Sequence, residues 1–227
     1  MKTISRLLLL TTTLFLTSIV QAKNFEGTVQ MQITGSDGGP HNLTYSIKNS
    51  HVRTDIQVSA GQSATAIMDL DKDEMIILMP GQPMYMTMAI KATVEKATGQ
   101  KADESALENT GITTKILGYD CTKYLAKTKD GVIEIWATDQ LGMFMGLGNM
   151  MGGKKAKSGW EQAITGKNFF PLRVVSAAKG ANKFSLETTA IEPKSLPDSS
   201  FAPPPGYQKF DLGGMMQGMG GANPFGG

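Results

Sequence analysis

The stretch "LTYSIKNSHVRTDIQV", residues 43–58, is the clearest indication of how this chain folds. Apolar and polar side chains alternate on both sides of "KNS", with Leu43, Tyr45 and Ile47 before it and Val52 and Ile56 after it. Successive side chains of a β-strand point to opposite faces, so each half is a strand with one buried and one wet face. Two such runs around so short a turn predict a β-hairpin.

The same alternation recurs along the chain. It begins in "FEGTVQMQI" and returns in "ATAIMDL", "EMIILM", "MYMTM", "TKILG", "CTKYLAK", "VIEIWAT", "LRVVSAA" and "KFSLETTAI". Short strands at such regular spacing indicate an antiparallel sheet, because a parallel sheet needs a helix between strands. We therefore expect a mainly β fold: a curved antiparallel sheet or open (half) β-barrel of about eleven strands, with a few short helices packed as a lid.

Two segments interrupt the strands. Residues 89–109 are rich in Ala, Lys and Glu, and this composition predicts one or two short helices. Residues 139–166 start with Asp139, a candidate helix cap, but several glycines follow, and each weakens a helix by about 1 kcal/mol relative to alanine. From Leu141 to Met151 we expect an apolar loop with partial helix, either a mobile lid over the sheet or a disordered insertion.

The two ends of the chain differ from its strand-rich middle. Residues 1–22 hold two basic residues, then an apolar run shorter than the roughly 20 residues that cross a bilayer, then small residues. This pattern predicts a signal peptide cleaved near Ala22, and hence a periplasmic or secreted protein without a transmembrane anchor. We expect a single β-rich domain over residues 23–210 and a disordered Gly/Met-rich tail over residues 211–227.

Charge and cysteine content exclude several functions. Residues 1–22 account for two of the 22 basic residues and none of the 20 acidic ones, so the mature chain would be formally neutral. Nucleic acids and anionic membranes bind concentrated positive charge, and we expect neither as a partner. Cys121 is the only cysteine, which excludes an intramolecular disulfide, and we expect it to be a buried small hydrophobe rather than a catalytic thiol.

No familiar catalytic pattern occurs in the chain. The two histidines, His41 and His51, would lie roughly 20 Å apart along the predicted hairpin, too far to share a metal or a proton. The acidic stretch "DLDKDE", residues 69–74, lacks the glycine and the distal glutamate of a calcium loop and is typical of a solvated turn. We therefore expect a protein that is not an enzyme and has no cofactor.

Several longer motifs carry a family resemblance. An exported chain with "FEGTVQMQI" (25–33), "KILGYDCTKY" (115–124), "IEIWATDQLG" (133–142), "FFPLRVVSAAKG" (169–180) and "SLPDSSFAPPPGYQK" (195–209) resembles the domain of unknown function 4412 family. That family in turn looks like the periplasmic lipoprotein carriers LolA and LolB. The resemblance implies an open antiparallel barrel closed by helices, with a hydrophobic cavity for acyl chains, and it assigns no functional residue.

Apolar residues on strands and in the long loop are the candidate ligand-binding residues. In "MPGQPMYMTM" (79–88), "PGQP" predicts a turn and the following methionines share one strand face, which lines either a packed core or a hollow one. Trp136 shares a strand face with Val132 and Glu134, opposite Ile133 and Ile135. The candidates for binding an apolar ligand are Met84, Met86, Met88, Ile133, Ile135, Trp136, Met143, Phe144 and Met145.

The expected function is that of an exported binding or carrier-type protein. Its partner would be an apolar small molecule or lipid, such as a lipoprotein acyl chain, or an envelope protein. One alternative is a periplasmic Cu(I)-binding protein, because methionine thioethers are soft ligands, with Met215, Met216 and Met219 as candidate ligands. Another is a structural envelope protein. The identity of the ligand stays open, as does whether the interior of the sheet is hollow or packed.

Overall fold

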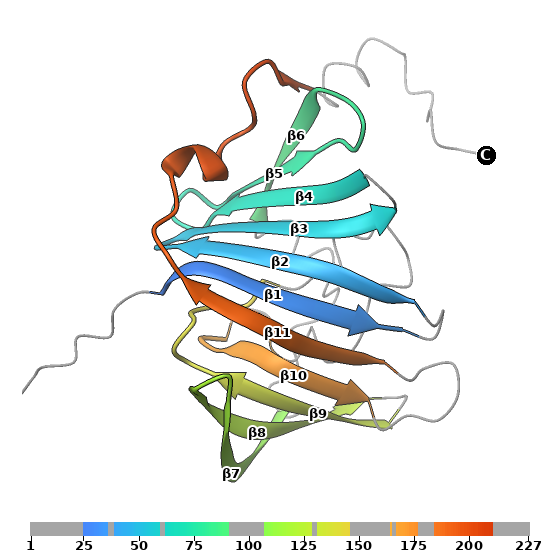
Figure 1. Cartoon of the computed structure of the whole chain (residues 1–227), viewed down its shortest axis with the longest axis vertical. Coiled ribbons are helices and arrows are strands. Elements are labelled where there is room, and N and C mark those ends of the chain that lie inside the picture. The colour runs from blue at the N-terminus through green and yellow to red at the C-terminus, as the bar shows by residue number, and fades with distance from the viewer. Residues whose placement is uncertain are drawn as a thin grey trace, which may run out of the picture.

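Figure 1 shows the protein as a computed structural model. The structure describes residues 25–35, 39–59, 62–90, 107–128, 131–145, 164, 167–176 and 184–210. These residues form one sheet of twelve strands and contain hardly any helix. The predicted mainly β fold, a curved and open antiparallel sheet, is confirmed.

The strands follow the alternating runs of the sequence. Their bounds are β1 Glu26–Thr34, β2 Pro40–Lys48, β3 His51–Ser59, β4 Gln62–Asp69, β5 Glu74–Leu78, β6 Met84–Ala89, β7 Leu107–Ile116, β8 Tyr119–Thr128, β9 Gly131–Thr138, β10 Phe170–Ser176, β11 Ser185–Pro193 and β12 Gln208–Lys209. A short 3-10 helix, η3, spans Asp198–Phe201. Eleven strands overlap the predicted runs. The twelfth, β12, was not predicted, because it is two residues long and follows a proline-rich segment.

The sheet consists of two meanders, β1 to β6 and β7 to β11, which are joined by the pairing of β1 with β11. The order is β12-β6-β5-β4-β3-β2-β1-β11-β10-β9-β8-β7, and every neighbouring pair is antiparallel except β12 and β6. Strands β1 to β6 run consecutively to one edge, whereas β7 to β11 start at the other edge and return to β1 (Figure 1). The β1–β11 pair therefore depends on residues more than 150 positions apart in the chain.

The predicted hairpin around "KNS" is confirmed as β2 and β3. Lys48 pairs with His51 across a turn of two residues, Asn49 and Ser50. Asn49 has φ 53°, in the left-handed region, which asparagine tolerates better than most residues because its short side chain makes local hydrogen bonds.

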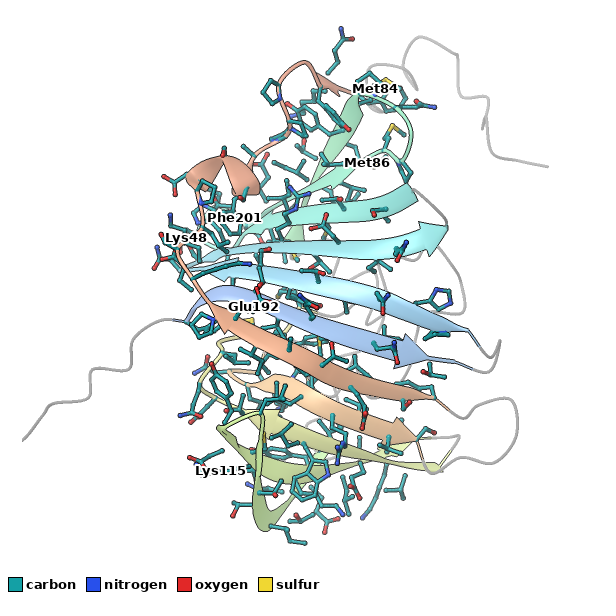
Figure 2. All side chains as sticks on the ribbon, viewed as in Figure 1. Lys48, Met84, Met86, Lys115, Glu192 and Phe201 are labelled. Carbon is teal, nitrogen blue, oxygen red and sulfur yellow. The ribbon has the colours of Figure 1, made fainter. Side chains whose placement is uncertain are left out.

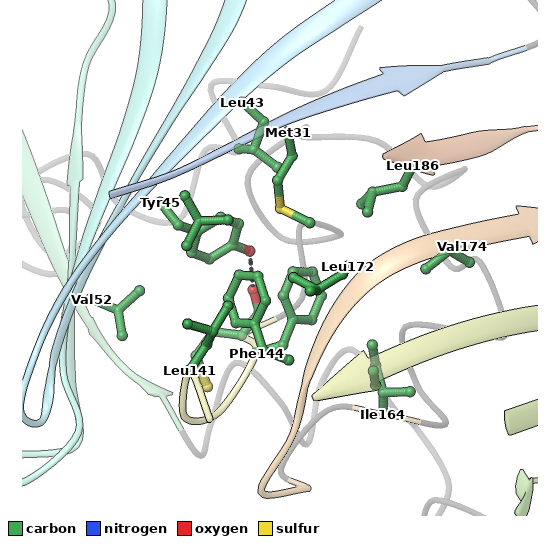
Figure 3. Close-up of a cluster of buried hydrophobic side chains, with 14 of the residues drawn as sticks. Met31, Leu43, Tyr45, Val52, Leu141, Phe144, Ile164, Leu172, Val174 and Leu186 are labelled. Atoms are coloured by element: carbon green, nitrogen blue, oxygen red, sulfur yellow. Dashed lines mark hydrogen bonds between the residues drawn. The ribbon is translucent and has the colours of Figure 1, made fainter. Parts of the chain in front are cut away.

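The two faces of the sheet differ in composition. On the inner face, apolar residues from β1, β2, β9, β10 and β11 meet in one buried cluster. Figure 3 shows part of it, with Tyr45 and Met31 on one side, Leu172 and Val174 on the other, and Phe144 between them. The outer face carries most of the ion pairs, such as Lys123 with Glu134 and Arg173 with Glu187.

Part of the outer face is covered by residues 194–210, which we call the strap. The strap leaves β11, forms η3 and then adds β12 beside β6. Its Leu196 and Phe201 pack against Ile67 and Ile76, in a second and smaller apolar cluster. The ammonium of Lys48 donates to the Leu196 carbonyl and to the Asp198 carboxylate, each at 2.7 Å. Apolar packing and hydrogen bonds together attach the strap to the sheet.

Three predictions about the interruptions need correction. Ala89 belongs to β6 and residues 107–109 begin β7, so these ends of the predicted helical segment are strand, whereas Ile90 is helical as predicted. Residues 91–106 lie outside the described part. No helix begins at Asp139, because residues 139–145 form a bend, a turn and irregular chain. The side chains of Leu141, Phe144 and Met145 are buried in the core, not exposed in a mobile loop. The rest of the predicted loop, residues 146–163, lies outside the described part of the chain.

Candidate functional site

Register places the inner-face residues in rows that cross the sheet. Each residue pairs with one on the next strand, and directly paired residues of antiparallel strands point to the same face. The middle row runs from the packed centre of the sheet to its β6 side: Val29, Tyr45, Thr54, Ala66, Ile77 and Met86. Beside it run Ile47, Val52, Met68, Met75 and Met88. The predicted shared face of Met86 and Met88 is thus the inner face.

The centre of the inner face is filled by the protein's own side chains. Phe144 is fully buried, with ring centroids 5.4 Å from Tyr45 and 5.5 Å from Phe170. The hydroxyl of Tyr45 donates to the Met145 carbonyl at 2.6 Å, and Figure 3 shows this bond beside Leu141. Of the predicted ligand-binding residues, four are therefore buried core residues, namely Ile133, Ile135, Phe144 and Met145. Three more pack against the same cluster: Met88, Trp136 and Met143.

The β5–β6 side of the inner face is less completely buried. Met75 is 4% exposed, whereas Met84, Met86 and Met88 are only half-buried. Met88 packs against the main cluster. Met84 and Met86 lie nearer the start of β6, away from this cluster (Figure 2). The structure thus separates Met84 and Met86, but not Met88, from the core cluster of Ile133, Ile135 and Phe144, with which the sequence grouped all three methionines.

Met79 is a residue that the sequence reasoning missed. Its amide donates to the Met84 carbonyl at 2.9 Å, so the two methionines are opposite each other across the "PGQP" turn. Met79 is also half-buried. The signal was present in the sequence, because extending the hairpin one pair beyond Leu78 and Tyr85 aligns Met79 with Met84. We call Met79, Met84 and Met86 the methionine edge.

Trp136 lies on the outer face, opposite Ile133 and Ile135, as the strand alternation predicts. Its indole Nε1 donates to the Glu134 carboxylate at 2.7 Å, and Lys123 Nζ lies 5.5 Å from the ring centroid. Lys123 also pairs with Glu134, and its hydrogen bond is the main reason why the pKa of Glu134 is lowered. These contacts use the polar edge of Trp136 in a surface ion cluster, away from the inner face.

Two buried hydroxyl groups of the inner face lack a partner. Within the described residues, the Thr54 and Thr188 side-chain oxygens accept and donate no hydrogen bond. Thr54 is fully buried between Tyr45 and Ala66 in the middle row. A buried hydroxyl without a partner destabilises the fold by about 1–3 kcal/mol.

The other chemically notable residues have structural partners. Cys121 is 1% exposed, as expected for a small hydrophobe, and burial raises the pKa of its thiol. His51 lies 3.5 Å from Asp69, whose pKa is lowered mainly by a hydrogen bond from the Lys72 ammonium. The "DLDKDE" stretch is a turn between β4 and β5, as predicted. No group of three or more His, Cys, Asp or Glu residues suited to a metal ion occurs within the described part of the chain.

Other predictions fall on residues that are not described. They are the signal peptide over residues 1–22, the tail over residues 211–227 and the tail methionines Met215, Met216 and Met219. Among the described residues, no helix has the length and apolar character needed to cross a membrane.

The chain belongs to the family described as domain of unknown function (DUF4412), whose model matches residues 25–207. No curated protein matches the chain. Among solved structures it is similar to two structures of PNGF-II, in space groups C2 and P21, with 14% and 15% identity and TM-scores of 0.48 and 0.49. The matches cover 82% and 85% of this chain but only 31% and 32% of those chains. The comparisons do not confirm the resemblance to LolA and LolB, and likenesses this low carry no functional inference.

Proposed function

We propose that this protein is an exported, non-enzymatic binding protein that holds an apolar ligand, such as a lipid or an acyl chain, against the β5–β6 side of the inner face. The single observation that carries the proposal is the change in burial along this face. The centre is closed by Phe144 and its neighbours, whereas Met84, Met86 and Met88 stay half-buried. A ligand on this side would bury the remaining methionine surface.

The chemistry of this side suits a flexible apolar chain. Ala64 and Ala66 on β4 are small, and Ile77 and Met86 flank them on β5 and β6. Methionine is unbranched and adapts to irregular shapes, so it contacts ligands of different lengths without strain. Each methylene group that a ligand buries contributes about 0.8 kcal/mol, and an acyl chain would gain several such increments.

The location and the lack of catalysis rest on the sequence. The first 22 residues have the pattern of a secretory signal, and an envelope or secreted location brings the protein close to lipids. The thiol of Cys121 is buried and is therefore not accessible as a nucleophile. An exported binding role fits these residues better than a reaction does.

Displacement of a fluorescent long-chain fatty acid from the purified protein tests the proposal. We expect saturable binding, weakened about tenfold or more when Met84 and Met86 are both replaced by glutamine, which keeps the length but adds polar atoms. Ile112→Gln is the matched control, because Ile112 is 54% exposed on β7. No binding by the wild-type protein, together with no lipid in native mass spectra, would reject the proposal and favour a structural envelope role.

A separate assay tests the non-enzymatic part. The protein is incubated with chromogenic ester, amide, phosphate and glycoside substrates at neutral pH. We expect no turnover above buffer, and turnover that survives repeated purification would show that the protein is an enzyme.

A further inference from the structure

The methionine edge has an unusual composition for a hairpin that merely fills a core. Alternation on β5 and β6 gives six inner-face positions from Met75 to Met88, and all but one of them hold methionine. The exception is Ile77. The two innermost methionines, Met75 and Met68 of β4, are 4% and 3% exposed and belong to the core cluster. Those at the turn end, Met79 and Met84, together with Met86, are only half-buried.

Register brings the side chains of these three half-buried methionines within reach of one another. Met79 and Met84 are directly opposite, and such pairs have Cβ atoms about 4.5–5.5 Å apart. Met84 and Met86 are two positions apart on one face of β6, about 6.6 Å along the strand. Met79 and Met86 are diagonal neighbours, at about 7–8 Å or less. Each flexible side chain extends beyond its Cβ, so three sulfur atoms can converge on one point above the hairpin.

A cluster of thioethers has a definite ligand preference. Thioether sulfur is soft and uncharged, and it selects Cu(I) over harder ions such as Zn²⁺, Mg²⁺ or Ca²⁺. Carboxylates or imidazoles at the same place would favour those harder ions. Within the described residues, no group of three or more such side chains is available to hold a metal.

The strap supplies a second and independent observation. It ends at Phe210, whose amide donates to the Tyr85 carbonyl at 2.7 Å, between Met84 and Met86. The next methionines in the sequence, Met215, Met216 and Met219, follow directly. Met215 is five residues beyond Phe210, and five extended residues span at most about 18 Å. Phe210, the last described residue before these methionines, is therefore held beside the methionine edge.

We propose that the thioethers of Met79, Met84 and Met86 form a binding site for Cu(I). The ion binds as Cu(I) with no change in oxidation state, and the hairpin itself supplies three ligands. The Cu(I) site is independent of the proposed function. Fatty-acid displacement and Cu(I) competition are separate measurements, so either proposal can fail while the other holds. Where both bind, they compete for the same methionines.

Competition with bathocuproine under anaerobic, reducing conditions tests the site. We expect the full chain to bind Cu(I), and the triple variant M79L/M84L/M86L to bind at least about tenfold more weakly, because leucine keeps the apolar volume but has no sulfur. The matched control M68L/M75L removes two buried methionines of the same face and should change the affinity less than about twofold. Equal Cu(I) affinity of the triple variant and the wild type would overturn the proposal.

Two further measurements locate the site. A chain that ends at Phe210 should keep Cu(I) binding, whereas loss of all binding on this truncation would assign the ion to the tail and overturn the hairpin site. In the wild-type protein labelled at the methionine methyl groups, Ag(I), a soft ion without accessible redox chemistry, should shift the resonances of Met79, Met84 and Met86 and leave that of Met75 in place. Unchanged resonances at all three would also overturn it, whatever the stability of the variants.

Discussion

Gly27 lies where the first strand of the sheet approaches the last long one. It has φ +157°, and a Cβ atom added there would lie 2.2 Å from the Glu192 carbonyl oxygen of β11. That oxygen belongs to the backbone and cannot move aside without breaking the β1–β11 pairing. A residue without a side chain is therefore required at this position.

Substitution of this glycine tests the close approach. We expect Gly27→Ala to lower the free energy of unfolding by about 2–3 kcal/mol, through overpacking and an unfavourable φ, as measured by urea denaturation. Gly39→Ala is the control, because a Cβ there meets no atom within 4 Å. Equal effects of the two substitutions would contradict the steric explanation.

The unpartnered hydroxyl of Thr54 leads to the opposite expectation. Thr54→Val removes a buried hydroxyl that makes no hydrogen bond among the described residues, so the free energy of unfolding should rise by about 1 kcal/mol. Thr65→Val is the comparison, since the Thr65 hydroxyl donates to Asp55 at 2.6 Å, and its loss should destabilise the protein. Thermal and chemical unfolding of both variants provide the measurement. Destabilisation by Thr54→Val would reveal a partner for its hydroxyl.

At the scale of elements, the strap combines apolar and ionic contacts. Phe201 and Leu196 bury their side chains on Ile67 and Ile76, while Glu26 accepts a hydrogen bond from the Leu196 amide at 2.7 Å. This bond is the main cause of the lowered pKa of Glu26, and the nearby charge of Lys48 contributes. The strap also adds β12 to β6, which would otherwise be an edge strand of the sheet.

The lowered pKa of Glu26 makes attachment of the strap depend on pH. Because the pKa is lower in the folded state, the stabilisation is complete above the ordinary glutamate pKa of about 4.3 and is lost as the pH falls through the folded value. The melting temperature of the wild type should therefore exceed that of Glu26→Gln at neutral pH, and the difference should shrink in acid. Glu108→Gln, on β7 away from the strap, is the control. A difference that is constant with pH would contradict this assignment.

Hairpins were the most predictable elements, and the strap was the least. In β2 and β3, alternation and the "KNS" turn are both local, so residues 43–58 alone define the pair. β12 and η3 form in "PKSLPDSSFAPPPGYQK", which shows no alternation, and their positions depend on contacts with β3, β4, β5 and β6. The predicted helical ends at residues 89 and 107–109 are strand because pairing with β5 and β8 outweighs the weak propensities of those residues.

At the scale of the whole molecule, side chains from both halves of the sheet meet at Phe144. It comes from the segment after β9, and it contacts Tyr45 of β2 and Phe170 of β10. Phe144 is fully buried, and so are Leu141 and Ile164. Among the described residues, the curved sheet therefore has a filled centre, and its β5–β6 side is a less completely buried part of the inner face.

Removal of the Phe144 ring tests whether this centre is tightly packed. We expect Phe144→Ala to lower the free energy of unfolding by about 3–5 kcal/mol, and an aromatic molecule of benzene size to restore part of this loss by filling the space. Ile112→Ala, at an exposed position on β7, should change the stability by less than about 0.5 kcal/mol. A loss below about 1 kcal/mol for Phe144→Ala would show that the centre is loosely packed.

The candidate site was only partly predictable from the sequence. Alternation correctly gave a shared face to Met84, Met86 and Met88, and it placed Trp136 opposite Ile133 and Ile135. It could not show that Ile133, Ile135 and Phe144 are core residues while Met84 and Met86 are half-buried, because both groups have the same apolar character. Burial depends on which strands become neighbours, and the neighbours of β6 and β9 are far apart in the sheet.

Strands β1 to β11, the β2–β3 hairpin and the common face of the β6 methionines follow from local sequence alone, since each depends on a period of two and on turn residues close by in the chain. The tertiary structure alone decided that β1 pairs with β11, that Phe144 fills the centre, that the strap covers the outer face and that Met79 joins Met84 and Met86. These features depend on contacts between distant residues, or on the register of a pair, and strand alternation alone contains no information about either.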